Sequence, residues 1–293
     1  MFINPKTDFA FKKIFGSEQS KDILINFLDA ILYQGRSNIA DLEILDPYQA
    51  PRIKGIKDSF LDVKASLQGG QTVIIEMQVL NVLGFDKRVL YNAAKAFSIQ
   101  LDVGEDYTML NPIIALTITD FEMFPHSPKV ISSYALREKE EMSSYSDDIE
   151  LVFVELPKFK KELDQLADLS DKWIYFLKNA NKLRSVPSNM KSESALNHAF
   201  AIAEQSRLSR EELEILEKRE MFLHDNRNAI LYAEQKGRQE GKEEGREEGR
   251  EEGRQAEKQA IAIALLEKGI PIDLVAETSG LSIEMLLKLQ RKA

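Results

Sequence analysis

The segment QTVIIEMQV, residues 71–79, constrains the fold more than any other stretch, because it combines the pattern of a buried β-strand with a carboxylate. Val73, Ile74 and Ile75 form its apolar centre, and Glu76 interrupts the run before Met77 resumes it. Burial of an ionised carboxylate without a partner is strongly unfavourable. We therefore expect Glu76 to have a counter-ion, a bound metal or a raised pKa.

The segments around this strand predict a mixed α/β domain. SFLDVKASL, residues 59–67, precedes it and ends at a Gly69-Gly70 pair, which is typical of a β-hairpin. Apolar periodicity predicts helices over residues 17–35 and 83–104, and apolar runs predict strands over 39–45 and 111–120. The expected order is helix, strand, strand, strand, helix, strand. Further strand-like segments follow at 129–138 and 149–156, and residues 46–58 are a predicted loop.

Composition narrows the class of protein. A hydrophobic content of 43% indicates a globular chain, and 293 residues allow one large domain or two ordinary ones. The sequence has no cysteine, which excludes disulfides and thiolate metal sites and fits a reducing compartment. No long apolar run or signal-peptide pattern is present, so we expect a cytoplasmic protein without a membrane partner. The net charge of -9 argues against non-specific coating of DNA but leaves room for a local basic face.

The predicted hairpin places two carboxylates near each other. Alternation along a strand puts Glu76 and Gln78 on the same face. The Gly69-Gly70 turn brings the segment containing Asp62 back beside Glu76. Two carboxylates that converge at a sheet surface form a hard-oxygen site suited to Mg²⁺, which takes its remaining ligands from water and substrate phosphate.

The helix predicted after this strand adds positive charge. Arg88, Tyr91 and Lys95 are spaced at i, i+3 and i+7, so they share one helix face that can bind phosphate. A plain structural interpretation stays open. In it, Glu76 forms an ordinary ion pair with Arg88 or Lys64, and the helix face is simply solvated.

Several motifs together resemble the Rpn-type PD-(D/E)XK nuclease family, whose members are associated with transposition and recombination. The strand motif EMQ followed by RVLY is the most specific part, and the resemblance covers about residues 4–125. The motifs that carry it are KTDFAFKKIFG, LDPYQ, LDVKA, IIEMQV, KRVLYNAAKAFSIQL and PIIALTITDFEMF.

This resemblance implies a restriction-endonuclease-like α/β core of order α-β-β-β-α-β, which matches the order of elements given above. We expect this nuclease-like domain at residues 1–155 and a helical region at 156–233. A charged Gly-Glu-Arg repeat at 234–258 and a short helical C-terminal unit at 259–293 follow.

The resemblance also implies a metal-dependent DNA endonuclease of recombination or mobile elements. Asp62 and Glu76 would hold Mg²⁺, or alternatively Mn²⁺. Gln78 stands where the general motif has lysine, and its neutral amide can still orient a water molecule. Lys64, two residues after Asp62, or Lys95 from the helix is then a candidate for the missing positive charge.

DNA is the expected partner, but cleavage is not the only interpretation. Lys12 and Lys13 in FAFKKIF are candidates for a rim that binds the DNA backbone, and a solvated face of a first helix is the alternative. The replacement of lysine by Gln78 supports a second hypothesis. In it, the nuclease fold does not cleave and serves as a DNA-binding or oligomeric adaptor.

The C-terminal part suggests assembly. In the repeat KGRQEGKEEGREEGREEGRQAEKQ, glycine recurs every four residues, which fits either a solvated, partly helical linker or close helix–helix contact in a homo-oligomer. A third hypothesis is therefore an assembly protein organised by this repeat. Residues 270–289 fit a helix-turn-helix with Gly280 at the turn. The second helix is poor in base-reading side chains, so we expect packing or oligomerisation there.

Overall fold

The computed structural model describes residues 1–49 and 59–290. The loop predicted over 46–58 therefore lies mostly outside the described residues. The chain divides into two compact units, residues 1–226 and residues 227–293, which are described separately. None of the helices in the described ranges is both long enough and apolar enough to cross a membrane.

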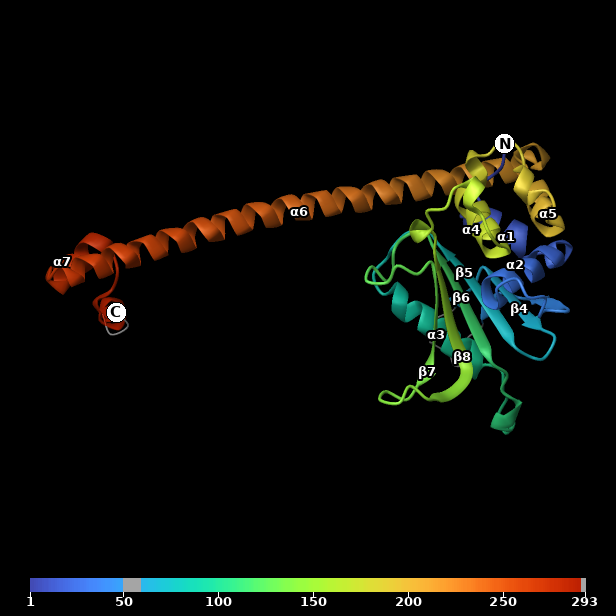
Figure 1. The fold of residues 1–293 in the computed structure, drawn as a ribbon, viewed down its shortest axis with the longest axis horizontal. Coiled ribbons are helices and arrows are strands. Elements are labelled where there is room, and N and C mark those ends of the chain that lie inside the picture. The colour runs from blue at the N-terminus through green and yellow to red at the C-terminus, as the bar shows by residue number, and fades with distance from the viewer. Residues whose placement is uncertain (50–58, 291–293) are drawn as a thin grey trace. The chain divides into compact units, whose positions relative to one another are not determined.

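The first unit contains a six-stranded mixed sheet with the order β1-β4-β5-β6-β8-β7 (Figure 1). β1, β4 and β5 are antiparallel, β5, β6 and β8 are parallel, and β7 runs antiparallel to β8. The strands are β1 (Leu42–Leu45), β4 (Val63–Leu67), β5 (Thr72–Gln78), β6 (Ile113–Thr119), β7 (Ile131–Arg137) and β8 (Ser144–Glu155). A separate two-stranded ribbon pairs β2 (Tyr48–Gln49) with β3 (Ser59–Phe60).

The hairpin between β4 and β5 confirms the prediction from Gly69-Gly70. Both glycines have positive φ values, 122° and 91°, which other residues rarely adopt. A Cβ added to Gly70 would also lie 2.4 Å from Oδ1 of Asn111. The backbone thus favours glycine at position 70, and a larger residue there would also displace the exposed Asn111 side chain.

Helices cover both faces of the sheet, which explains why β5 is an almost continuous apolar run (Figure 1). Val73, Ile75 and Met77 belong to the large core cluster that also contains helix residues from one side, whereas Ile74 packs with residues of α3 on the other. The helices of the large cluster are α1 (Asp8–Phe15), α2 (Lys21–Tyr33), α4 (Leu169–Asn179) and α5 (Ser194–Ile202), and α3 is Phe85–Ser98.

The helical region after the sheet shares this core. Trp173 of α4 is fully buried, with its ring centroid 5.8 Å from that of Phe15 and 5.6 Å from that of Phe27. Its indole nitrogen donates to Asn26 at 2.9 Å. Short 3₁₀ helices connect the elements: Glu18–Ser20, Tyr107–Met109, Leu156–Lys158, Leu163–Gln165, Ala180–Lys182, Ser188–Met190 and Gln205–Arg207.

One predicted strand is divided in the structure. The single strand expected over residues 59–67 is split into β3 and β4, with Leu61 and Asp62 between them. β3 pairs with β2, whereas β4 pairs with β1 and β5. The break matters because it removes Asp62 from the regular ladder.

α6 (Arg210–Glu267) begins in the first unit and continues through the charged repeat as one helix. At each of the five repeat glycines, an added Cβ would meet no heavy atom within 4 Å among the described residues. In the second unit, α7 (Ile272–Ser279) and α8 (Ile283–Gln290) are joined at Gly280, whose φ is 70°. A small core of Ala262, Val275, Leu281 and Leu286 holds this end together.

Candidate active site

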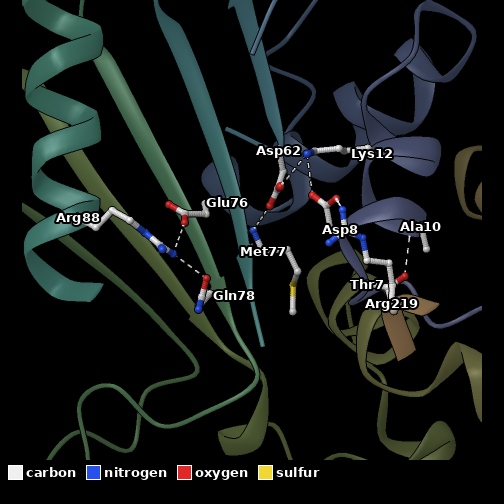
Figure 2. Close-up of polar contacts among 10 residues, drawn as sticks. All are labelled: Thr7, Asp8, Ala10, Lys12, Asp62, Glu76, Met77, Gln78, Arg88 and Arg219. Carbon is white, nitrogen blue, oxygen red and sulfur yellow. Dashed lines mark hydrogen bonds and ion pairs between the residues drawn. The ribbon is translucent and has the colours of Figure 1, made fainter. Parts of the chain in front are cut away.

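β5 presents Glu76 and Gln78 to α3. The Arg88 guanidinium bridges them, since Nη2 donates to Oε1 of Glu76 at 2.6 Å and to Oε1 of Gln78 at 2.7 Å (Figure 2). Asn92, one turn later on α3, donates from Nδ2 to Oε2 of Glu76 at 3.4 Å. Glu76 is mostly buried, whereas 40% of the Arg88 side chain is exposed. The arrangement therefore combines an enclosed carboxylate with a cation that solvent can reach.

The environment of Glu76 has opposing effects on its ionisation. Burial raises the pKa of the Glu76 carboxyl. The charge and hydrogen bond of Arg88, and then the Asn92 amide, lower this pKa without cancelling the effect of burial. Glu76 thus has the counter-ion and the raised pKa that a carboxylate in an apolar strand requires.

The rest of the predicted helix face is divided between two environments. Lys95 is buried and donates from Nζ to the backbone carbonyl of Gln49 at 2.7 Å. Tyr91 is on the exposed side of α3, with its ring centroid 6.0 Å from Lys95 Nζ. Sequence spacing identified Arg88 but missed Asn92, although its i+4 position after Arg88 places it on the same face.

Asp62 lies beside β5, immediately before the first residue of β4. Its backbone amide donates to the Ile75 carbonyl at 3.2 Å, and its carboxylate Oδ2 accepts from the Met77 amide at 2.7 Å (Figure 2). The side chain thereby bonds an amide of β5 that lies beyond the start of β4 at Val63. Because it satisfies an amide in the plane of the sheet, Asp62 is held firmly against β5.

α1 brings a second carboxylate to Asp62. Lys12 Nζ lies 2.7 Å from Oδ1 of Asp8 and 3.6 Å from Oδ1 of Asp62. Asp8 and Asp62 are also joined by a side-chain hydrogen bond. On the far side of Asp8, Arg219 of α6 lies 3.9 Å from Oδ2 (Figure 2).

The two acids share one proton unequally. Burial, together with the hydrogen bond to Asp8, raises the pKa of Asp62 to about 7. Burial also acts on Asp8, but hydrogen bonds from Lys12 and Asp62 outweigh it and hold the pKa of Asp8 below its usual range. Below about pH 7, Asp62 therefore retains a proton, which it donates to the Asp8 carboxylate. Sequence analysis missed Asp8, whose only signals were its place in the first turn of α1 and its i,i+4 spacing to Lys12.

The two remaining predicted lysines lie elsewhere. Lys13 forms an ion pair with Glu212 of α6. Lys64 is opposite Ile74 in the hairpin register and therefore shares the α3 face of the sheet. Burial lowers the pKa of Lys64, and nearby Asp46 opposes this effect.

The acids thus form two groups on either side of β5. Figure 2 shows Glu76 turned toward Arg88 and Asp62 turned toward Lys12. Across residues 1–49 and 59–290, no three acidic or histidine side chains gather into a ready-made metal site. The donors that are present are carboxylate and amide oxygens, which suit a hard divalent cation that completes its shell with water and phosphate.

A sequence model of the family described as PD-(D/E)XK nuclease family transposase matches residues 5–233. This range contains the sheet, α1 and α3, and with them both groups of acids. Neither a curated protein nor a solved structure matches the chain. The family consists of nucleases related to mobile elements, and PD-(D/E)XK nucleases generally use divalent metal ions. The six-stranded mixed sheet with its flanking helices is consistent with that fold, and the chain belongs to the PD-(D/E)XK nuclease family of transposases.

Proposed function

We propose that this protein is a metal-dependent DNA endonuclease that hydrolyses phosphodiester bonds, with Mg²⁺ as the ion. The observation that carries the proposal is a pair of mostly buried carboxylates with raised pKa, Glu76 in β5 and Asp62 bonded to it, within the range that matches the family. Buried acids with perturbed ionisation are typical of functional sites.

The residues around Asp62 fit a divalent cation. Burial keeps the proton on Asp62, and the nearest cation, Lys12, divides its charge between Asp62 and Asp8. A divalent cation would replace that proton as the partner of the Asp62 carboxylate. In the structure Asp62 faces Lys12 and Glu76 faces Arg88. The proposal therefore requires both carboxylates to turn toward each other when they hold the ion, with Asp8 supporting Asp62. When bound, Mg²⁺ supplies Lewis-acid stabilisation of the phosphate and lowers the pKa of a bound water molecule.

Gln78 has a positioning role in this proposal. Its Nε2 donates to the Leu80 carbonyl at 2.6 Å while its Oε1 accepts from Arg88 at 2.7 Å, so both ends of the amide are fixed. Arg88, rather than Lys64 or Lys95, then supplies the positive charge that lysine has in the general motif. A partly exposed guanidinium can bind a phosphate through two donors.

The test is cleavage of supercoiled plasmid by the purified full chain with Mg²⁺, Mn²⁺ or EDTA. Glu76→Gln and Asp62→Asn are compared with Glu43→Gln, an exposed strand carboxylate of β1 that serves as a matched control. We expect metal-dependent nicking that falls at least ~100-fold in the two site variants and is unchanged in the control. Site variants that cut as fast as wild type would show that the residues are assigned wrongly.

A non-cleaving DNA adaptor is the second candidate. The observation that favours it is that Arg88 already neutralises Glu76 and binds the glutamine that replaces lysine. If the folded wild-type protein shifts DNA in a gel without nicking it, whichever metal ion is added, that result would support the adaptor and exclude the endonuclease.

A further inference from the structure

The turn between β5 and α3 exposes two aliphatic side chains. Leu83 has 107% of its reference area exposed, and Val82 is 40% exposed. The turn is nevertheless well tied, since the Phe85 amide donates to the Val82 carbonyl at 3.2 Å and the Arg88 amide donates to Gly84 at 3.1 Å. Gly84 has a φ of 78°, which suits glycine. Leu83 is therefore held in solvent by an ordered backbone.

A cavity of about 550 Å³ lies directly beside this turn. Its size is that of a small-molecule site. One wall is the turn itself, and the other is the segment after β6, which contributes Phe121 and Phe124. Buried Glu155 fixes that second wall, because its Oε1 accepts from the amides of Met123 at 2.6 Å and Phe124 at 3.0 Å.

The cavity is connected to the candidate active site through Arg88. The guanidinium that binds Glu76 and Gln78 also lies 5.0 Å from the centroid of the Phe85 ring. Phe85 in turn packs edge-on against Phe121, with 5.7 Å between ring centroids. A phosphate bound at Arg88 would thus place the adjacent base step next to the turn and the cavity.

The lining of the cavity suits a base better than a phosphate. Phe121 and Phe124 offer aromatic surface, and base–aromatic stacking tolerates any sequence. The carboxylates of Asp86 and Glu122 repel phosphate, and together with the Asn81 amide oxygen they can accept hydrogen bonds from amino groups on base edges. Lys87, exposed on α3 beside the turn, supplies a charge for the DNA backbone.

We propose that Val82 and Leu83 enter the base stack of DNA beside the phosphate bound by Arg88, and that the displaced base occupies the cavity. Aliphatic wedges of this kind separate base steps in other DNA-binding proteins. The proposal rests on the proposed function and refines its substrate: DNA in which the base next to the scissile phosphate is unstacked. A base pair that opens easily, or a base that is already unpaired, favours cleavage.

The first experiment compares wild type with Leu83→Ser and with Val103→Ser, a control because Val103 is equally exposed and lies in the loop after α3. Each protein cuts a paired duplex and the same duplex with an unpaired base at the mapped cut site. We expect Leu83→Ser to cut the paired duplex about tenfold more slowly and the unpaired substrate at the wild-type rate. Val103→Ser should match wild type on both. If Leu83→Ser lost cleavage rate equally on both substrates, or lost none on either, the proposed insertion into the base stack would be wrong.

A second readout separates this proposal from the endonuclease assignment. A duplex that carries 2-aminopurine at the displaced position becomes more fluorescent when the base unstacks. In Ca²⁺, without cleavage, wild type and Glu76→Gln should raise the emission, and Leu83→Ser should not. If the emission rises but the protein does not cleave under Mg²⁺, the insertion of Val82 and Leu83 is retained and the endonuclease is rejected. If the protein cleaves but the emission does not rise, only the insertion is rejected.

Discussion

Replacement of Asp62 by asparagine is expected to make the first unit more stable at alkaline pH in the absence of metal. The folded state holds the Asp62 proton up to a pKa of about 7, whereas the unfolded chain releases it near the ordinary value of 3.8. The folded protein therefore binds more protons between these values, and its stability falls as the pH rises from about 4 to about 7. Asparagine has no charge to lose, and its carbonyl oxygen can still accept from the Met77 amide.

The size of the effect follows from the two pKa values. A difference of about three pH units, at 1.36 kcal/mol for each, gives an upper limit of about 4 kcal/mol at pH 8. The gain in stability on replacement is smaller than this limit for two reasons. Asp62 shares its proton with Asp8, and asparagine lacks the attraction of an ionised Asp62 to Lys12. Asp8 does not add to the fall in stability between about pH 4 and pH 7. Its pKa is lowered, so its contribution to stability is lost only at more acidic pH.

Urea unfolding in EDTA, followed by the fluorescence of Trp173, measures this directly. Trp173 is the only tryptophan and is fully buried in the first unit, so its signal reports that core. The free energy of unfolding of wild type should fall between pH 5 and pH 8 by more than that of Asp62→Asn, which keeps only the smaller fall caused by the raised pKa of Glu76. Asp147→Asn, a substitution of a carboxylate with 80% exposure, should follow wild type. If the free energy of unfolding of wild type were constant over this range, or ran parallel to that of Asp62→Asn, the ionisation of Asp62 would not control this pH dependence.

Three further outcomes are expected. Arg88→Lys should keep the fold but lose at least ~10-fold in plasmid nicking, because an ammonium cannot reproduce the planar guanidinium that bridges Glu76 and Gln78; equal activity would exclude this role. Gly70→Ala should lower the free energy of unfolding by about 2 kcal/mol or more, and by more than Gly69→Ala, because only position 70 combines positive φ with a close neighbour; urea melts that rank them in reverse would contradict this. Truncation after residue 233 should leave the Trp173 melt unchanged and, if the repeat assembles the chain, reduce the number of chains per particle determined by light scattering; an unchanged number would separate the repeat from assembly.

Local pattern was sufficient to predict the framework around the site. The apolar run predicted β5, the paired glycines predicted the hairpin, and apolar periodicity predicted α3. These features depend on neighbours within a few residues, so a single sequence expresses them. The ion pair between Glu76 and Arg88 is one of the two that the plain structural interpretation named.

The features that sequence missed depend on contacts between distant segments. The break at Asp62 is invisible in SFLDVKASL, because it arises when β3 pairs with β2 while β4 pairs with β5. Asp8 joins the site only because α1 packs against the sheet, 54 positions from Asp62 along the chain. Lys95 is held by the backbone of Gln49, 46 residues away, a partner that helix periodicity cannot reveal.

In the proposed function, Asp62 and Glu76 hold a divalent metal ion. Calorimetric titration of Mn²⁺ into the full chain at pH 8 tests it without reliance on cleavage. We expect wild type and Glu43→Gln to bind the ion alike, and Asp62→Asn and Glu76→Gln each to bind it at least ~10-fold more weakly. Equal affinity in all four proteins would contradict the claim and leave the two carboxylates with a structural role alone.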